Sequence, residues 1–392
     1  MKVLHVTSSI DPEAGGVSHV VRNLAPNLEK TGLKNEILTL DSPSQSFLSD
    51  ESLIVHALGP GKSSWAYSSE LLPWFRQHLS HFQAVILHGL WQYPGYALLK
   101  AVSKIRKSSG DAPQVLIFPH GMLDPWFQND PSRRLKALRN EVYWRVFERR
   151  VVNDADGLLF TCEEEKLLAQ TTFSGFRPQG EHVVGYGIEE PPDDSSTLRM
   201  AFAQACPNLP SEQPYLLFLS RIHPKKGVEL LLKAYGKLLA ERKDLPALVI
   251  AGPLDGDYAD EMKRLAEKIT EDVGRPAQIY FTGMLQGDAK WGALYGCQVF
   301  VLPSHQENFG IAVVEALACG KKVLITNKVN IWREIDEAGA GWVGDDTLEG
   351  AEEGLVRVLS EADLSSEAAM ACYRENFSVE GAARQLKAVI TR

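Results

Sequence analysis

The sequence lacks several features that would point to particular classes of protein. Its five cysteines are scattered, and no CxxC pair or cluster of cysteine with histidine occurs, which argues against a structural zinc site or a disulfide framework. No segment approaches the roughly 18 consecutive apolar residues that indicate a membrane-spanning helix. Positive charge is not in excess, because 41 Lys and Arg stand against 50 Asp and Glu, a net charge of −9. Nucleic-acid-binding domains are usually basic, so we expect no nucleic-acid partner.

What remains is the composition of an ordinary globular protein, with 44% hydrophobic and 23% charged residues. The 392 residues suffice for two domains of roughly 100–200 residues each. The opening segment MKVLHVTSSIDPEAGG has only a short apolar core and indicates a strand rather than a signal peptide. The five scattered cysteines of the chain are typical of a set of reduced thiols, so we expect a cytoplasmic protein.

Short apolar segments alternate with amphipathic ones along the whole chain. The strands predicted in the first half lie at 2–8, 34–41, 84–89, 114–121 and 157–162. A second series of predicted strands lies at 215–222, 247–253, 278–284, 299–304 and 321–327. Strands that alternate with helices predict parallel sheets with helices on both faces, an α/β fold.

The two series of strands are separated by a segment over 183–197 that is rich in Gly, Pro, Asp and Ser, which indicates a linker. We therefore predict two Rossmann-like domains, an N-terminal one over 1–190 and a C-terminal one over 191–373, with a helix over 374–392 that packs back on the first. Parallel sheets bind ligands at the carboxyl ends of their strands. We expect these two edges to face each other across a cleft.

The first motif is the pair Gly15-Gly16, between the first predicted strand and the first helix. Glycine allows the backbone to approach a phosphate, and the helix N-terminus supplies N–H groups. An ordinary strand-to-helix turn explains the pair equally well. Asp41 at the end of the second strand suggests a dinucleotide-binding fingerprint, but the GxGxxG spacing is absent.

A second motif, LSRIHPKKG over 219–227, follows the first strand of the second series. Arg221 and Lys226 flank a turn that leads into a helix, and a guanidinium and an ammonium at this place suit a bound dianion. Plain surface charge is the alternative, and we assign it to Lys225.

The third motif, PSHQENFGIAVVEALACGKKV over 303–323, is the most specific. Glu307 lies in a predicted loop, Asn308-Phe309-Gly310 opens a helix, and Glu315 interrupts an apolar run within that helix. A carboxylate among apolar residues requires a partner, and Glu315 could accept hydrogen bonds from two vicinal hydroxyls. A loop acid and a helix-surface acid without further role are the alternative.

These three motifs, in this order, resemble those of the retaining GT-B glycosyltransferases of family 4, the glycosyl transferase group 1 family. The resemblance extends over nearly the whole chain. The segments LHGLW (87–91) and FPHGMLDPW (118–126) are further similar to bacterial, notably cyanobacterial, enzymes that assemble exopolysaccharide or envelope polysaccharide. One departure is Asn308, where family members often carry glycine, and we expect it to adjust contacts around the transferred sugar.

The resemblance implies a role for each matching residue. Those implied for the catalytic step are Glu307, Arg221, Lys226 and His120. Those implied for binding the sugar donor are Gly16, Arg221, Lys226, Met284, Glu307, Asn308, Phe309, Gly310 and Glu315. The acceptor is assigned to His88 and His120, although either histidine could equally be an ordinary residue at a strand end.

In more detail, Arg221 and Lys226 would hold the diphosphate, with Gly16 nearby. Glu307 and the turn over 308–310 would contact the sugar hydroxyls and the phosphates. Glu315 would hold the ribose hydroxyls. Met284 lies where the family contacts the base through backbone groups, and His120 would lie near the reacting sugar.

The implied activity is the transfer of a hexose, glucose in the first instance, with retention of configuration. The donor would be a nucleotide diphosphate sugar, with UDP favoured, and the acceptor a saccharide or lipid-linked saccharide in polysaccharide biosynthesis. The resemblance implies no metal and no cofactor. A nicotinamide-dependent oxidoreductase and a non-catalytic sugar-nucleotide sensor remain as alternatives.

The segment over 132–150 contains seven basic residues and two acidic ones. Its helical periodicity places Leu135, Leu138, Val142 and Val146 on one face, with arginines around the rest, and Tyr143, Trp144 and Phe147 add aromatic character. Such a helix suits peripheral contact with an anionic membrane surface, such as the inner face of the plasma membrane. A solvated basic helix packed on the first domain is an equal alternative.

Overall fold

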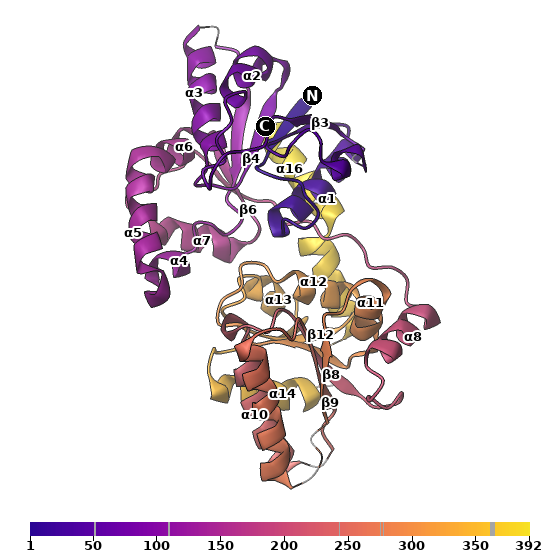
Figure 1. Ribbon diagram of the computed structural model, residues 1–392. Helices are drawn as coiled ribbons and strands as arrows, with labels where there is room; N and C mark the ends of the chain where they lie inside the picture. Colours follow the sequence, from indigo (N-terminus) through magenta and orange to yellow (C-terminus); the bar gives the residue numbers. More distant parts are fainter. Residues whose placement is uncertain (51, 109, 243, 275, 277, 361–364) are drawn as a thin grey trace. The chain divides into compact units, whose positions relative to one another are not determined.

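The computed structural model describes residues 1–50, 52–108, 110–242, 244–274, 276, 278–360 and 365–392 (Figure 1). The chain forms two compact units. Unit 1 comprises Met1–Glu189 together with Ser378–Arg392, and unit 2 comprises Glu190–Phe377. The predicted boundaries, 190/191 and 373/374, lie within a few residues of these.

Unit 1 is built on a seven-stranded parallel sheet with the strand order β3-β2-β1-β4-β5-β6-β7. The strands are β1 Lys2–Val6, β2 Lys34–Thr39, β3 Ile54–Ala57, β4 Ala84–His88, β5 Gln114–Phe118, β6 Gly157–Phe160 and β7 Glu181–Val183. The chain changes direction across the sheet between β1 and β4, and loops that follow strands at such a point commonly form a binding site.

Unit 2 is built on a six-stranded parallel sheet with the order β10-β9-β8-β11-β12-β13. Its strands are β8 Tyr215–Leu219, β9 Ala247–Ala251, β10 Ile279–Gly283, β11 Val299–Leu302, β12 Lys322–Thr326 and β13 Gly341–Gly344. The corresponding change of direction lies between β8 and β11. The central strands of both sheets are mostly apolar and mostly buried, as expected of strands covered on both faces.

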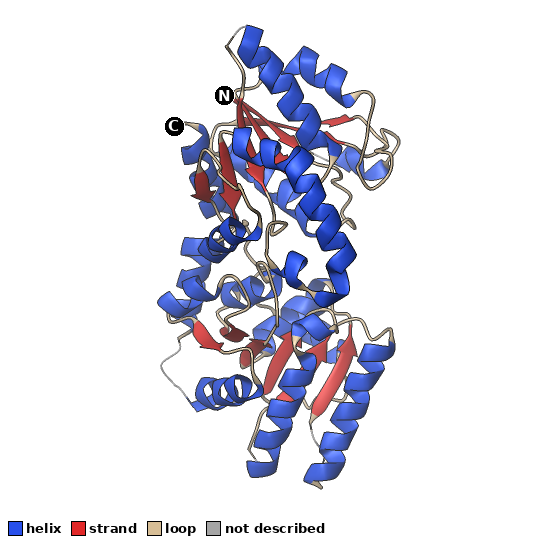
Figure 2. Ribbon diagram, turned by 90° about the vertical axis from the view of Figure 1, so that its left-hand side faces the viewer, coloured by secondary structure: helices blue, strands red, loops and turns tan. Residues whose placement is uncertain are grey.

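Helices connect the strands and cover the sheets, so that in each unit the strands run between helices (Figure 2). The helices of unit 1 are α1 Gly16–Lys30, α2 Leu71–His78, α3 Tyr93–Ser108, α4 Trp126–Asn129, α5 Arg134–Tyr143, α6 Arg149–Asp154, α7 Glu163–Thr172 and α16 Val379–Ile390. Those of unit 2 are α8 Ser196–Ala205, α9 Val228–Glu241, α10 Asp257–Val273, α11 Gly287–Gly296, α12 Ile311–Ala318, α13 Trp332–Glu337, α14 Leu348–Ser360 and α15 Ser366–Cys372.

Every predicted strand corresponds to an observed one, and the α/β class with two parallel sheets is confirmed. The strands that the sequence pattern did not reveal are β3, β7 and β13, which lie at the edges of the two sheets. They are short, and their residues are only partly buried. Without a continuous apolar run, an edge strand of three or four residues resembles a loop.

The chain returns to unit 1 after completing unit 2. The amide of Val379 donates to the carbonyl of Ile188, with N···O 3.0 Å, and helix α16 packs against α1. Leu386 of α16 is fully buried, and the ammonium of Lys387 donates to the carbonyl of Thr31 at the end of α1. Unit 1 therefore needs a segment that follows unit 2 in the sequence.

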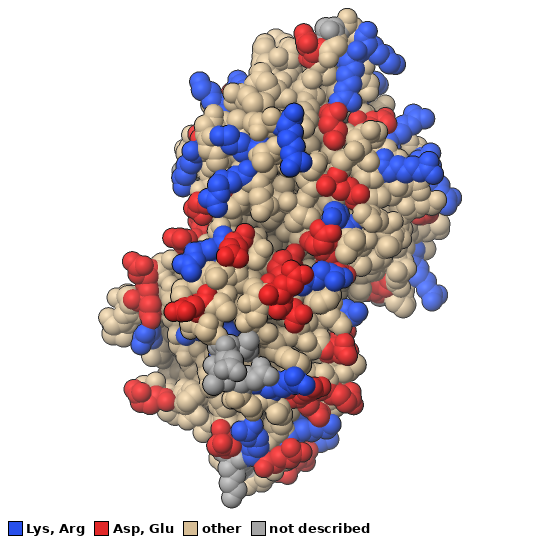
Figure 3. Space-filling model, turned by 180° about the vertical axis from the view of Figure 1, so that it is seen from behind, with Lys and Arg blue, Asp and Glu red and all other residues tan. Residues whose placement is uncertain are grey.

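Charged side chains of both signs are interspersed over both units on the face shown in Figure 3. Among the described residues, no helix is long and apolar enough to cross a membrane. All five cysteines are buried and none forms a disulfide with another described residue. Burial raises the pKa of the Cys297 thiol to about 12.

Candidate functional site

The loop after β8 contains the predicted pair Arg221 and Lys226. It closes in a short 3₁₀ turn, Pro224–Lys226, and helix α9 begins at Val228. Gly227 joins the two with φ 68°, and a Cβ there would collide with the carbonyl oxygen of Pro303, so only glycine fits. This contact presses the turn against the segment that follows β11.

Lys226 and Glu307 form an ion pair, although they are 81 positions apart in the sequence. Their side chains are only 11% and 21% exposed. Two predicted site residues from separate motifs thus meet at the carboxyl ends of the neighbouring strands β8 and β11. A partly buried charge without a partner is strongly unfavourable, so each side chain fixes the other.

The loop after β11 is anchored through its backbone. The amide of Glu307 donates to the carbonyl of Lys328 (2.9 Å), and its own carbonyl accepts from the amide of Asn330 (3.0 Å). One carboxylate oxygen of Glu307 also accepts from the amide of Asn308 (3.1 Å). Gly310, with φ 80°, then precedes the first residue of helix α12, Ile311. Hydrogen bonds within the protein therefore fix the conformation of this loop without a ligand.

Unlike the side chain of Glu307, the side chain of Phe309 points into the core of unit 2. Its side chain is buried and packs edge-on against Phe377, with ring centroids 5.7 Å apart. The side chain thus belongs to the core of unit 2, and only the backbone of Phe309 is available to a ligand.

Glu315 lies one turn into α12 and forms an ion pair with Lys290 of α11, with N···O 2.7 Å. The carboxylate is 13% exposed and the ammonium 22%. The ammonium also lies 4.0 Å from the ring centroid of Trp291. The sequence showed that Glu315 requires a partner, but the strand-end motifs gave no sign that Lys290 supplies it.

Arg221 and Met284 are both exposed. Within the described part of the chain, Arg221 makes no hydrogen bond or ion pair. The charge of Arg221 nevertheless affects its neighbour His223. Burial lowers the pKa of His223 most, and the positive charges of Arg221, Lys225 and Lys226 lower it further. The loop after β8 is therefore a concentration of positive charge. Met284 follows β10, and its sulfur accepts a hydrogen bond from the side-chain amide of Gln286.

In unit 1, the predicted Gly16 begins helix α1, and Gly15 precedes it with φ 97°. The hydroxyl of Tyr186 donates to the carbonyl of Gly16 (O···O 2.7 Å). A Cβ at position 16 would lie 2.8 Å from that hydroxyl, so this close approach explains the glycine at position 16. The ring of Tyr186 also lies beside His120, with centroids 6.3 Å apart, which places both predicted residues around one tyrosine.

The predicted histidines His88 and His120 are hydrogen-bonded to each other, with Nδ1 of His88 3.0 Å from Nε2 of His120. His88 ends β4, and His120 follows β5 with φ 53°. The turn after His120 is held by Glu165, a buried carboxyl that accepts from the amide of Gly121 at 2.5 Å. A third histidine, His5 on β1, bonds to His88 (3.0 Å). In the sequence, His5 is a polar residue within an apolar strand, and this was the only sign that it requires a polar partner.

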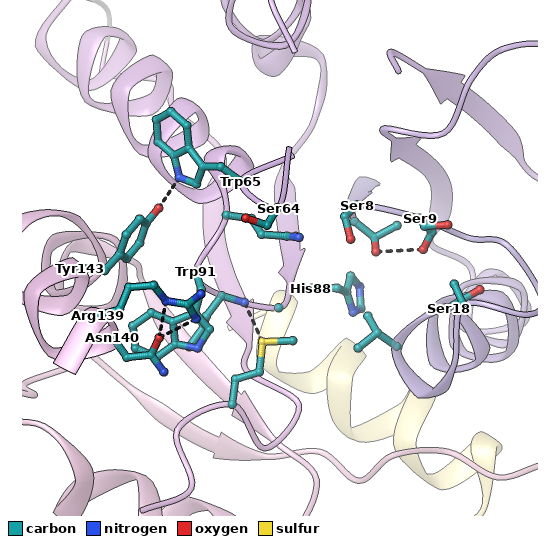
Figure 4. Close-up of a pocket in the computed structure, with 17 residues that line it drawn as sticks. Ser8, Ser9, Ser18, Ser64, Trp65, His88, Trp91, Arg139, Asn140 and Tyr143 are labelled. Atoms are coloured by element: carbon teal, nitrogen blue, oxygen red, sulfur yellow. Dashed lines mark hydrogen bonds between the residues drawn. The ribbon is translucent and has the colours of Figure 1, made fainter. Parts of the chain in front are cut away.

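A cavity of about 520 Å³ opens beside His88 in unit 1. In Figure 4, Trp91, Tyr143 and Arg139 lie on one side of it and Ser8, Ser9 and Ser18 on the other. The indole N–H of Trp65 donates to the hydroxyl of Tyr143 (2.5 Å), and Arg139 donates to Asn140 (3.0 Å). The sequence did not reveal this cavity, because its aromatic residues come from three distant segments.

Glu148, buried behind this cavity, was also missed. It ends a π-helical turn over Trp144–Glu148, and it lines a smaller adjoining cavity with His88 and Thr7. Burial raises its pKa to about 8, against an opposing hydrogen bond from the backbone of Trp91. Its carboxyl is therefore largely protonated at neutral pH.

The basic segment over 132–150 forms α5, the π-helical turn and the start of α6. Trp144 is fully buried and donates to the carbonyl of Ser174 (2.9 Å), so our expectation that it adds aromatic character to the surface is wrong. The aliphatic face, by contrast, is turned outward. The exposed fractions are Leu135 86%, Leu138 63%, Val142 56% and Val146 54%.

Comparison with known proteins connects both units to one activity. Residues 15–187 match the family described as Glycosyl transferase 4-like domain, and residues 202–375 match Glycosyl transferases group 1. The serotype-specific mannosyltransferase WbdA of Escherichia coli is 35% identical over 120 residues, 31% of this chain and 14% of WbdA. This chain therefore spans a small part of WbdA.

Two longer similarities cover nearly the whole chain. The D-inositol 3-phosphate glycosyltransferase of Corynebacterium jeikeium is 22% identical over 372 residues, 85% of this chain and 80% of that protein. The structure of Anabaena HepE in complex with UDP covers 100% of both chains, with a TM-score of 0.70 and 15% identity. The likeness in structure shows that this chain has the GT-B fold.

The turn at Gly227 yields a direct test of how the Lys226 loop is held. Gly274 has nearly the same conformation, φ 66°, but no atom of the described residues lies within 4 Å of the place that a Cβ would occupy. We expect Gly274→Ala to cost about 1–2 kcal/mol of unfolding free energy from conformation alone. Gly227→Ala should cost clearly more, because the methyl group collides with Pro303. Urea unfolding of both variants measures this, and equal losses would contradict the contact.

Glu148 predicts a pH dependence of stability. Its pKa is raised from 4.5 to about 8 in the folded protein, so the folded state holds this proton more tightly than the unfolded state. The unfolding free energy contributed by this group is therefore present below about pH 4.5 and is lost as the pH rises towards 8. Glu148→Gln should remove this loss, so that its stability relative to wild type increases from pH 5 to 8. A constant difference across that range would refute the assignment.

Proposed function

Because residues 202–375 match the glycosyl transferases of group 1 and residues 15–187 match a glycosyl transferase 4-like domain, we propose that the chain is a retaining glycosyltransferase. It transfers a hexose, glucose in the first instance, from a UDP-sugar to a saccharide or lipid-linked saccharide in polysaccharide biosynthesis, without a metal. The observation that carries this proposal is the partly buried Lys226–Glu307 pair at the N-terminus of α9.

The pair supplies what the departing diphosphate needs. Cleavage of the anomeric C–O bond leaves negative charge on the nucleotide diphosphate, and preorganised cations and helix N-termini stabilise such charge. Lys226 and Arg221 both lie in the loop that opens α9. Glu307, held beside Lys226, would contact the sugar and keep the ammonium in place. Glu315 would hold the ribose hydroxyls.

UDP is supported by the fold neighbour HepE, whose structures include complexes with UDP, with UDP and glucose, and with UDP-glucose. We assign the base to the segment at Met284, through its backbone groups. Retention follows if the leaving phosphate accepts the acceptor proton on the same face of the sugar. Glu307 then acts by position and charge and forms no covalent bond.

The cavity beside His88 suits the acceptor. Its aromatic side chains Trp91 and Tyr143 offer apolar faces for sugar rings, and the serine hydroxyls opposite can bond to sugar hydroxyls. Arg139 at its rim adds a group that binds phosphate or carboxylate. A saccharide with an anionic group, such as a lipid-linked diphosphate saccharide, fits this combination.

The activity is tested by incubating the full-length protein with UDP-, GDP- and ADP-sugars and measuring the free nucleotide released. We expect release with UDP-glucose that increases when an acceptor is present, and a product with the donor's anomeric configuration by NMR. Binding without release would favour a sugar-nucleotide sensor. Reduction of a nicotinamide cofactor would favour an oxidoreductase, and a glycosyl adduct on Glu307 by mass spectrometry would contradict the mechanism.

The donor clamp predicts the behaviour of single variants. Lys226→Ala and Arg221→Ala should each lower kcat by about 100-fold or more, the usual loss when one preorganised charge-stabilising group is removed. Lys233→Ala, on an exposed face of α9 and paired with Glu229, is the matched control and should be close to wild type. Steady-state nucleotide release measures all three, and near-normal turnover in either clamp variant would exclude that residue.

We also propose that the exposed aliphatic face of α5 and the π-helical turn contacts an anionic membrane. Full burial gives each aliphatic side chain roughly 1.5–3 kcal/mol, and each basic residue near an anionic surface adds about 1 kcal/mol. The basic residues are Arg133, Arg134, Lys136, Arg139, Arg145, Arg149 and Arg150. Apolar residues flanked by positive charge match a lipid surface, and this placement would bring unit 1 to a lipid-linked acceptor.

Vesicle flotation tests this contact, with phosphatidylcholine alone and with 30% phosphatidylglycerol (about one anionic lipid in three). The protein should float only with the anionic vesicles, and changing Leu135, Leu138, Val142 and Val146 to Thr or Gln should abolish flotation. Met200→Gln, an exposed apolar residue of unit 2, is the control. Flotation that ignores anionic lipid, or a concentration-dependent dimer lost in the fourfold variant, would overturn the membrane assignment.

A further inference from the structure

Four polar side chains form one hydrogen-bonded chain through the apolar core of unit 1. They are Asn35 on β2, His5 on β1, His88 on β4 and His120 after β5, in the order in which these strands lie in the sheet. The distances are 3.2 Å from Asn35 Oδ1 to His5 Nε2, 3.0 Å from His5 Nδ1 to His88 Nε2, and 3.0 Å from His88 Nδ1 to His120 Nε2. The rings of each successive pair are nearly parallel, with interplanar angles of 20° and 15° and centroids 5.3 Å apart.

All three histidines are neutral near pH 7. Burial lowers the pKa of His5 to about 4 and that of His120 to about 3, and it lowers the pKa of His88 well below its ordinary value. A neutral imidazole carries one N–H and one lone pair. Each ring in the chain must therefore donate in one direction and accept from the other.

Asn35 sets that direction. Its Nδ2 donates to the carbonyl of Leu33 (2.8 Å), so its Oδ1 faces His5 and can only accept. His5 therefore carries its proton on Nε2 and accepts through Nδ1 from Nε2–H of His88. His88 in turn accepts through Nδ1 from Nε2–H of His120. The opposite direction would oppose two lone pairs between Asn35 and His5.

At the far end, the chain leaves a lone pair on Nδ1 of His120. This atom is buried and has no hydrogen-bond partner within the described residues. A buried acceptor without a partner is unfavourable, and a hydroxyl that donates to it would relieve that penalty. The ring lies beside Tyr186, which is bound to Gly16.

We propose that Asn35, acting through His5 and His88, positions His120 so that Nδ1 accepts a hydrogen bond from a hydroxyl of the sugar substrate. Asn35, His5 and His88 are positioning residues, and only His120 touches the substrate. The role of the hydroxyl rests on the proposed glycosyl transfer, whereas the direction of the chain does not.

The direction is tested on the unchanged protein by ¹⁵N NMR of its histidine side chains, which distinguishes a protonated from an unprotonated ring nitrogen. We expect Nε2–H and unprotonated Nδ1 in His5, His88 and His120. A proton on Nδ1 of His120 overturns the proposal, whatever the activity of the protein.

Two variants of Asn35 test the role of the chain in recognition. Asn35→Leu removes the acceptor, whereas Asn35→Asp keeps an oxygen facing His5. With UDP-glucose and its monodeoxy analogues as probes, wild type should reject the analogue that lacks the recognised hydroxyl. Asn35→Leu should reduce that rejection roughly tenfold in kcat/KM and should show mixed His120 tautomers.

Asn35→Asp should retain the wild-type tautomer and selectivity, and it remains available if Asn35→Leu does not fold. A purely structural role would lower stability or kcat for all the sugars equally, and that result would overturn the proposal. If no UDP-sugar is turned over at all, the proposed function fails, but the NMR result still decides the direction of the chain.

Discussion

The structure depends on the fact that parallel strands deliver all their following loops to one edge of a sheet. In unit 2, this places the loop after β8 against the loop after β11, where the Lys226–Glu307 pair forms. A partly buried ion pair holds only if both partners are present. Gly227 makes the approach feasible, because any larger residue would meet the Pro303 carbonyl. The Lys226–Glu307 pair, the turn at Gly227 and the start of α9 therefore depend on one another.

The two units treat polar groups in different ways. Unit 2 balances its partly buried carboxylates with lysines, Glu307 with Lys226 and Glu315 with Lys290. Unit 1 instead keeps neutral histidines in a directed chain and a protonated Glu148 beside its cavity. Charged groups of this kind suit a dianionic ligand, since a lysine paired with a carboxylate can bind the ligand's negative charge in its place. Neutral, oriented groups suit hydroxyls, for which the position of a single proton matters.

The strands and the motifs at their ends could be predicted from the sequence, because buried strands are continuous apolar runs. Lys226, Glu307 and Gly310 stand in the loops that follow two of these strands. Contacts between distant segments could not be predicted. Lys290 lies in a helix whose sequence carries no sign of Glu315, and Asn35 is an ordinary residue near the start of β2. The cavity in unit 1 was also invisible, since Trp65, Trp91 and Tyr143 are far apart in the sequence. The edge strands β3, β7 and β13 were missed because they lack a long apolar run.

The return of α16 to unit 1 has a consequence for the order of folding during synthesis. Unit 2 is inserted within unit 1, since Ser378–Arg392 leave the ribosome after Glu190–Phe377. The second unit can therefore complete its own contacts first, while the earlier-made sheet still lacks the helix that covers α1. An incomplete unit 1 would expose apolar surface on α1 throughout that interval, and apolar surface exposed during folding is prone to aggregate.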